Sequence, residues 1–384
     1  MMRILYFLPF CLSLILLGSC QQTSVRHSVS GNKNSALLAS FAESVEDSLE
    51  MIHAVALQNS FYHKLTADIE TMPVASDTGE DAADDPAIWF NKDSPYQSLI
   101  LGTNKTGGIY VYDLLGNILQ YREAGRINNV DLRDGFIYNN QSSVLVAGSN
   151  RSNNCISLFC IKKPGGNLSD TLMNIKSGVD EVYGICLYRS PKTHAFYVFV
   201  NGKGGRVEQW KIEGGETLQA SKVRDFDMGN QPEGMVASDQ NARLYIGVED
   251  LGIFETGAEP GTDTSVVTLP ESDSLNTHIT YDIEGLALFT YRNREYLIAS
   301  SQGNFSYAIF RLGKNPKYIT SFTIRDGHID GVEETDGLEV STAFLGSSFP
   351  MGMLVVQDGF NMEGDSLLNQ NFKFVSLKKV LKLL

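Results

Sequence analysis

Acidic residues recur along most of the chain at nearly constant spacing, each just before or within an apolar run. The set is Asp85, Asp131, Glu181, Glu233, Glu284 and Asp336, with gaps of 46, 50, 52, 51 and 52 residues. Two carboxylates held about 6 Å apart at an effective dielectric of 20 repel by roughly 3 kcal/mol. A fold that gathers this set therefore either raises some of the pKa values or binds hard cations. Oxygen ligands without His or Cys favour Ca²⁺ over transition metals.

Basic residues recur in phase with the first part of this acidic pattern. Lys105, Arg151 and Lys203 each stand in a short polar loop between two strand-like runs, within TNK, SNR and NGK. Lys and Arg do not ligate metals, so beside a carboxylate cluster they indicate an anion held against bound cations. Each of these residues taken alone is also compatible with a solvated loop. Because all three occupy the same position within their repeats, the pattern favours an anion site.

The elements that position these residues repeat six times. In each repeat a strand-like run meets a short polar loop and a second strand-like run, starting at Ser98, Ser143, Ala195, Ala242, Glu295 and Gly352. The start-to-start spacings are 45, 52, 47, 53 and 57 residues. A period near 50 with several strands per unit is typical of propeller blades. We therefore predict an all-β, six-bladed β-propeller with four-stranded antiparallel blades; packed β-sandwiches are the alternative, which six copies disfavour.

In a blade of antiparallel strands, the start of the first strand lies at the same end as the loop between the second and third strands. The acidic strand starts and the basic loops should therefore meet on one face of the ring. The expected face carries Asp85, Glu233, Glu249, Asp282, Glu284 and Asp336 beside Lys105, Arg151 and Lys203. Each acidic residue taken alone is also compatible with a role in capping a turn.

The N-terminus reads as an export signal. Residues 4–17 form an apolar run shorter than a membrane span, followed by Leu17-Gly18-Ser19-Cys20, which resembles a bacterial lipobox. We expect a signal peptide over residues 1–19, lipidation of Cys20, and a tether with an amphipathic helix over 20–66 before the propeller at 67–384. An ordinary signal peptide cleaved nearby is the alternative. The net charge of −14 argues against nucleic-acid binding.

A series of motifs resembles one known family. In chain order they are DDPAIWF, GTNKTGGIYVYDLLGN, GRINNVDLR, SNRS, DEVYG, EGM, LYIGVED, DIEGL, SSQGNFSYAIF, ETDG and NQNFK, spanning about residues 68–380. The sequence resembles the β-propeller phytases, the calcium-dependent 3-phytases of bacteria. This resemblance implies a phosphomonoesterase that hydrolyses myo-inositol hexakisphosphate (phytate), with several Ca²⁺ ions as cofactor.

The resemblance also implies roles for individual residues. Lys105, Arg151, Tyr183 and Lys203 match positions that contact substrate phosphates and, with Glu233, are the implied catalytic residues. The implied metal positions are Asp85, Asp131, Glu233, Glu249, Asp282, Glu284, Gln302, Asp326, Asp336 and Asp358. In the family's proposed mechanism, bridging Ca²⁺ ions neutralise phosphate charge and activate a water that attacks phosphorus directly.

Two other classes of function remain open on the residues alone. One is a non-catalytic, calcium-stabilised surface propeller that acts as a binding module. The other is a different calcium-dependent hydrolase on the same fold, such as a lactonase. Neither needs three basic loop residues facing a carboxylate cluster, so the pattern favours phosphoester hydrolysis. We expect an exported cell-envelope lipoprotein that is monomeric, touches the membrane only through its lipid, and has an inositol phosphate as its partner.

Overall fold

The computed structural model describes residues 49–384, apart from 78–79, 164–165 and 274. The predicted signal peptide, Cys20 and most of the predicted tether lie outside these residues. Residues 49–60 form a helix, in line with the amphipathic pattern, and the side-chain amide of Gln58 donates to the Val332 carbonyl at 2.7 Å. Within the described ranges, no helix is both long and apolar enough to cross a membrane.

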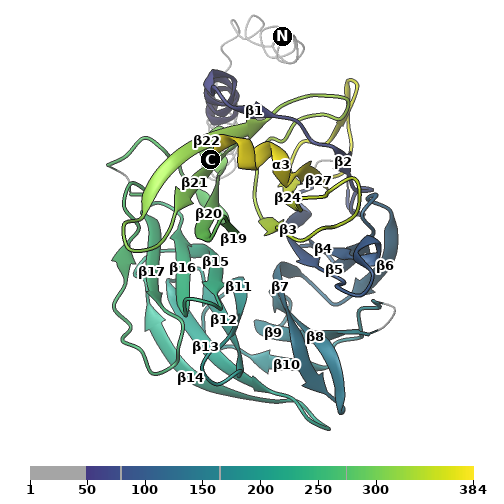
Figure 1. Ribbon diagram of the computed structural model, residues 1–384, viewed down its shortest axis with the longest axis vertical. Coiled ribbons are helices and arrows are strands. Elements are labelled where there is room, and N and C mark those ends of the chain that lie inside the picture. Colours follow the sequence, from purple (N-terminus) through teal and green to yellow (C-terminus); the bar gives the residue numbers. More distant parts are fainter. Residues whose placement is uncertain (1–48, 78–79, 164–165, 274) are drawn as a thin grey trace, which may run out of the picture. The chain divides into compact units, whose positions relative to one another are not determined.

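Six antiparallel sheets follow one another along the chain (Figure 1). Blade one contains β3 (Ala83–Trp89), β4 (Leu99–Asn104), β5 (Gly108–Tyr112) and β6 (Ile118–Glu123). Blade two contains β7 (Ile127–Tyr138), β8 (Gln141–Asn150), β9 (Cys155–Lys162) and β10 (Met173–Lys176). Blade three contains β11 (Val182–Arg189), β12 (Phe196–Gly202), β13 (Arg206–Glu213) and β14 (Gln219–Asp227).

The second half of the ring has the same plan. Blade four contains β15 (Pro232–Ser238), β16 (Arg243–Val248), β17 (Gly252–Gly257) and β18 (Val267–Thr268). Blade five contains β19 (Ile283–Tyr291), β20 (Arg294–Ser301), β21 (Ser306–Arg311) and β22 (Lys317–Ile324). Blade six contains β23 (Leu338–Ser341), β24 (Met353–Asp358) and β27 (Asn371–Ser376), with a hairpin of β25 (Met362–Glu363) and β26 (Ser366–Leu367) inserted. The described chain also has 3₁₀ turns at Pro95–Gln97, Gln302–Asn304 and Leu381–Leu383, and a C-terminal helix α3 (Leu377–Val380).

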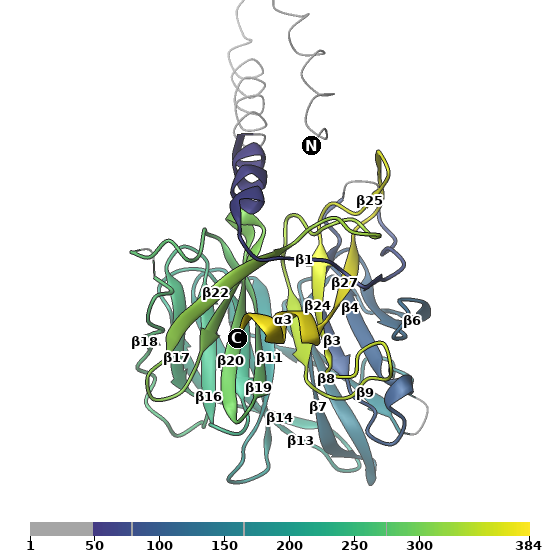
Figure 2. The same cartoon turned by 45° about the horizontal axis from the view of Figure 1, so that its top comes forward.

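The ring is closed by the segment before blade one. Strand β2 (Ile69–Glu70) pairs antiparallel with β27 and supplies the outer strand of blade six. Strand β1 (Lys64–Leu65) pairs in parallel with β22, and the two run side by side in both views (Figures 1 and 2). The innermost strands contact one another in sequence order, and β23 contacts β3 across the closure. The predicted six-bladed β-propeller is confirmed, with the addition that residues 64–65, assigned to the tether, extend blade five.

Burial explains why the six repeats were visible in the sequence. The second strand of each blade is covered on both faces, so β4 reads LILGTN with every residue buried. The outer strand β6 instead alternates between half-buried and exposed side chains. Continuous apolar runs next to short polar loops are therefore the signature of the middle strands, and all six predicted starts lie at or next to them.

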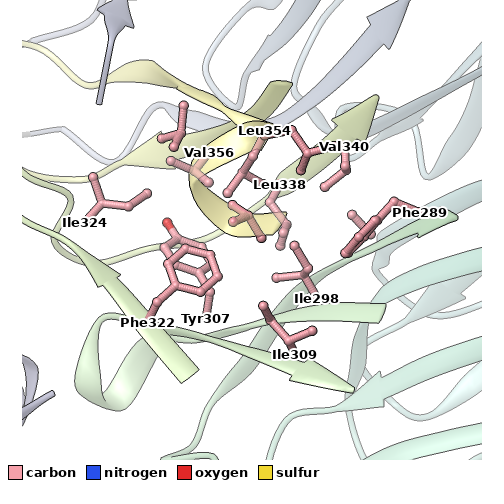
Figure 3. Close-up of a cluster of buried hydrophobic side chains, with 14 of the residues drawn as sticks. Phe289, Ile298, Tyr307, Ile309, Phe322, Ile324, Leu338, Val340, Leu354 and Val356 are labelled. Carbon is pink, nitrogen blue, oxygen red and sulfur yellow. The ribbon is translucent and has the colours of Figure 1, made fainter. Parts of the chain in front are cut away.

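Apolar side chains fill the wedge between neighbouring blades. Between blades five and six, for example, Ile298, Tyr307 and Phe322 face Leu354 and Val356 (Figure 3). All five of these side chains are buried. Rigid packing of this kind on both sides of each sheet fixes the inner strands that carry the polar residues of the ring.

Candidate active site

One backbone hydrogen bond recurs in successive blades and fixes the loops against the strand starts. The N–H of Lys105 donates to the Ala82 carbonyl at 2.7 Å, and that of Arg151 to the Arg126 carbonyl at 2.8 Å. The same contact joins Lys203 to Glu181 at 3.2 Å, Glu249 to Gln231 at 3.0 Å and Gln302 to Asp282 at 2.9 Å. The loops between second and third strands therefore lie beside the first-strand starts, as the antiparallel strand order predicts.

Glycines bring the inner strands close enough for their side chains to meet. A Cβ on Gly184 would lie 1.9 Å from the Glu233 carbonyl oxygen, and a Cβ on Gly234 would lie 2.0 Å from the Glu284 carbonyl oxygen. Each of these glycines follows a site residue, Tyr183 or Glu233. The backbone of the next blade thus occupies the space that a side chain would fill. The polar residue that precedes each glycine therefore lies near the axis of the ring.

Three buried carboxylates form the centre of the site. Asp84, Glu233 and Asp336 each offer an oxygen, and these oxygens lie within 4.8 Å of one another. Both carboxyl oxygens of Asp84, one of Glu233 and one of Asp336 have no hydrogen-bond partner. Buried polar atoms are normally paired, so these orphaned oxygens indicate a missing cationic partner.

The pKa values of this cluster reflect burial and mutual repulsion. Burial and the nearby Glu233, against the opposing effect of Lys105, together raise the pKa of Asp336 to about 8. Burial also holds the pKa of Asp84 well above its usual range, and Asp336 adds to the shift. The pKa of Glu284 is raised well above its ordinary value by burial and by the negative charge of nearby Glu233. A bound cation would relieve this repulsion.

The sequence pattern predicts Asp85 as the metal position, but Asp84 lies in the carboxylate cluster. Neighbouring residues of a strand point to opposite faces, and β3 has a register shift against β4 between Ala83 and Pro86. Asp85 instead accepts a hydrogen bond from the Val130 N–H at 2.9 Å and lines a cavity between the inner strands. The adjacent Asp84 and Asp85 indicate an acidic strand start, but the sequence alone does not determine which of the two carboxylates faces the cluster.

Asp131 lies with Asp85 along that cavity, together with Glu339, which the sequence analysis missed. Asp131 accepts hydrogen bonds from Arg133 at 2.8 Å and from the Leu187 N–H at 2.7 Å. Burial raises the pKa of Glu339 to about 8. Asp85, Asp131 and Glu339 thus line this cavity and do not belong to the cluster of Asp84, Glu233 and Asp336.

Lys105 is the basic residue nearest the cluster. Its Nζ lies 3.4 Å from Asp336, 3.6 Å from Asp84 and 2.7 Å from Asp81. Burial alone would lower the pKa of Lys105, but these carboxylates raise it above its ordinary value. Lys105 therefore stays charged and partly balances the buried carboxylates.

Arg151 and Lys203 come together over an aromatic ring. The Arg151 guanidinium lies 5.8 Å and the Lys203 ammonium 4.5 Å from the centroid of Tyr183. Arg151 also donates to Asn128 at 3.3 Å and forms an ion pair with Glu181. Burial raises the pKa of the Tyr183 hydroxyl, and the charges of Glu233 and Glu284 raise it further.

Glu249 and Asp282 extend the acidic part of the face. Burial raises the pKa of Glu249 to about 7, and Glu233 and Asp282 contribute to the shift. The Gln231 amide donates to Glu249 at 2.5 Å. The pKa of Asp282 is raised by burial and by Asp250. Gln302 is held against Asp282 through the backbone contact given above.

Two further metal positions predicted from the sequence, Asp358 and Asp326, form contacts outside the carboxylate cluster. Asp358 is within 3.3 Å of the fully buried Lys373, which also contacts Asp330 and Glu70 at 2.5 Å. Asp326 accepts the Gly331 N–H at 2.8 Å. Neither residue is among the three carboxylates of the cluster. The burial of Lys373 could not be predicted from the sequence, because a lysine within a strand-like run usually points to solvent.

Comparison with known proteins agrees with this geometry. The family model described as phytase matches residues 33–384. A 3-phytase of Bacillus subtilis (strain 168) is 44% identical over 341 residues, covering 86% of this chain and 87% of the Bacillus protein. A crystal structure of a functionally unknown protein from Desulfotomaculum acetoxidans covers 64% of this chain and 74% of its own, with 17% identity and a TM-score of 0.43, too weak a likeness to bear on function. The match over nearly the whole propeller, together with the basic residues beside a buried carboxylate cluster, assigns the chain to the phytase family.

Proposed function

We propose that this protein hydrolyses phosphomonoesters of myo-inositol hexakisphosphate, as a 3-phytase. The observation that carries the proposal is the meeting of Lys105, Arg151 and Lys203 with the buried cluster of Asp84, Glu233 and Asp336 on one face. Cationic side chains bind phosphoryl oxygens, while the carboxylates suit a metal. The name of the Bacillus relative, 3-phytase, supports the substrate.

We infer that the cluster holds divalent cations, with Ca²⁺ as the resident ion. Its ligand atoms are all carboxylate oxygens, and four of them are buried without a hydrogen-bond partner, which fits a hard cation. Asp84, Glu233 and Asp336 would hold the ion, and Glu249, Asp282, Glu284 and Gln302 are proposed as further ligands. A bound divalent cation supplies positive charge and Lewis-acid chemistry for phosphoryl transfer.

The side chains of this chain then have distinct tasks. Lys105, Arg151 and Lys203 bind and orient the phosphoryl group and stabilise the negative charge that develops on its oxygens. Tyr183 holds Arg151 and Lys203 in place through its ring.

The cellular setting is proposed from the sequence. The lipobox-like Leu17-Gly18-Ser19-Cys20 supports export and lipidation at Cys20, which would hold a monomeric enzyme in the bacterial cell envelope. Asp85, Asp131, Asp326 and Asp358 remain proposed metal positions outside the central cluster. Residues 67–384 would be the catalytic domain.

Phosphate release from inositol hexakisphosphate, measured in millimolar Ca²⁺, tests the activity. We expect release well above that from p-nitrophenyl phosphate at the same concentration, because a polyphosphate meets several basic groups. A folded protein that releases no phosphate would contradict the proposal and favour a calcium-stabilised binding propeller. Hydrolysis of lactones instead would favour the other hydrolase.

A further inference from the structure

Two basic residues of the site are each covered by a carboxylate from the rim. Asp81 lies 2.7 Å from the Lys105 ammonium, and Glu181 forms an ion pair with Arg151. The basic side chains are only 13% and 17% exposed, whereas Asp81 and Glu181 are 71% and 50% exposed. Both carboxylates therefore lie on the solvent side of their partners, where an incoming anion must arrive.

These carboxylates differ from those of the buried cluster. Asp84, Glu233 and Asp336 are buried between the inner strands, so they cannot leave without exposing the centre of the ring. Asp81 and Glu181 belong to loops that precede β3 and β11. Because exposed ion pairs are held only weakly, either carboxylate can exchange its partner for water at little cost.

We propose that Asp81 and Glu181 are internal competitors of the phosphate group. Each carboxylate occupies the position on Lys105 or Arg151 that a phosphoryl oxygen takes, and each moves into solvent when phosphate binds. The inference rests on the proposed function, because it requires phosphate to contact these two basic residues. Its consequence is weaker binding of inorganic phosphate, so the product leaves the calcium-loaded site more readily.

Binding of inorganic phosphate to the calcium-loaded protein, measured by titration calorimetry, tests this inference without any catalytic step. We expect Asp81→Asn and Glu181→Gln each to bind phosphate about two- to fivefold more tightly than the unaltered protein, because an exposed ion pair contributes up to about 1 kcal/mol. The KM for inositol hexakisphosphate should fall in the same variants, and inhibition by phosphate should become stronger.

Asp170→Asn is the matched control. Asp170 is 87% exposed and pairs with Arg122 at 2.5 Å, so it has the same kind of contact, but Arg122 lies in β6 at the outer edge of blade one. Its loss should leave phosphate affinity unchanged. If all three variants gained affinity equally, the effect would come from net charge and the inference would be wrong.

Two other results would overturn the inference. Unchanged or weaker phosphate binding in Asp81→Asn and Glu181→Gln would show that the carboxylates do not compete with phosphate. The variants could instead need more calcium for half-maximal activity and bind phosphate no more tightly. That result would show that Asp81 and Glu181 are metal ligands. Failure of the proposed function has a different signature, since a protein that releases no phosphate from inositol hexakisphosphate can still show tighter phosphate binding in the variants.

Discussion

Arg151 and Lys203 reach the site from blades two and three and meet over the ring of Tyr183. Neither pairs with the buried carboxylate cluster, and Arg151 pairs instead with the exposed Glu181, which an anion from solvent can displace. The site depends on single positions: both Asp84 oxygens lack a hydrogen-bond partner, whereas the adjacent Asp85 accepts the Val130 N–H and lines a separate cavity. Two predictions follow from these residues.

Replacing Lys203 or Arg151 with Ala should cripple hydrolysis and leave the fold intact. Each loses a charge that stabilises the transferring phosphoryl group, so we expect kcat/KM for inositol hexakisphosphate to fall about 100-fold. Steady-state kinetics measure the loss, and the unfolding temperature reports the fold. Wild-type rates in a folded variant would remove that residue from the site.

Asp84→Asn and Asp85→Asn should separate the two neighbouring acids. We expect Asp84→Asn to raise the calcium concentration for half-maximal activity by about tenfold or more, because it removes a ligand from the central cluster. Asp85→Asn should change that concentration much less, since its carboxylate already accepts the Val130 N–H. A calcium activation curve for each variant measures this. The reverse order would place Asp85 at the central ion.

At the scale of the elements, the first strands of the blades position the site. They pack closely because a glycine follows the site residue in several blades, and the next strand fills the space above it. In blades one to five, a backbone hydrogen bond also holds the loop after the second strand against the start of the first strand. The geometry of the cluster is therefore a property of inner-strand packing as much as of its carboxylates.

Gly234→Ala tests this packing. The added Cβ would lie 2.0 Å from the Glu284 carbonyl oxygen, so β15 and β19 must separate. We expect the unfolding temperature to fall by about 5 °C or more, with loss of activity, because overpacking of a core costs about 1–3 kcal/mol or more. Gly261→Ala is the control, since a Cβ there meets no atom within 4 Å. Equal effects of the two changes would contradict the close-packing account.

At the scale of the whole molecule, the sequence predicted the repeating parts better than the joins between them. Six blades were readable because each carries its own buried middle strands. Strand β2 has two residues, Ile69 and Glu70, too few for a period, and only the closed ring gives it a partner. The burial of Lys373 and the position of the half-buried Glu339 were equally unreadable, since segments distant in sequence enclose Lys373 and line the cavity beside Glu339.

The metal-free protein should become less stable as pH rises from 5 to 8. In the unfolded chain these carboxyls lose their protons near pH 4. In the folded protein, burial and repulsion raise the pKa of Asp336 to about 8 and hold that of Asp84 well above its usual range. The folded state thus binds more protons in this interval, and the stability present below about pH 4 is lost as pH rises through 8.

Thermal unfolding with chelator, at pH 5 and pH 8, measures this effect. Asp336→Asn is the control, because it removes a proton-binding carboxyl and should weaken the pH dependence. Calcium should restore stability, and more so at pH 8 than at pH 5, since it replaces the released protons. An unfolding temperature of the metal-free protein that rises from pH 5 to 8, equally in both proteins, would contradict the raised pKa values.

We propose that the carboxylate cluster binds a Ca²⁺ ion on which phytate hydrolysis depends. The most direct test is phosphate release from inositol hexakisphosphate by the purified protein with millimolar Ca²⁺, with excess chelator, and after calcium is restored. We predict release with calcium, loss of nearly all release with chelator, and recovery when calcium returns. Equal release in all three conditions, after confirmed removal of the metal, would contradict the account.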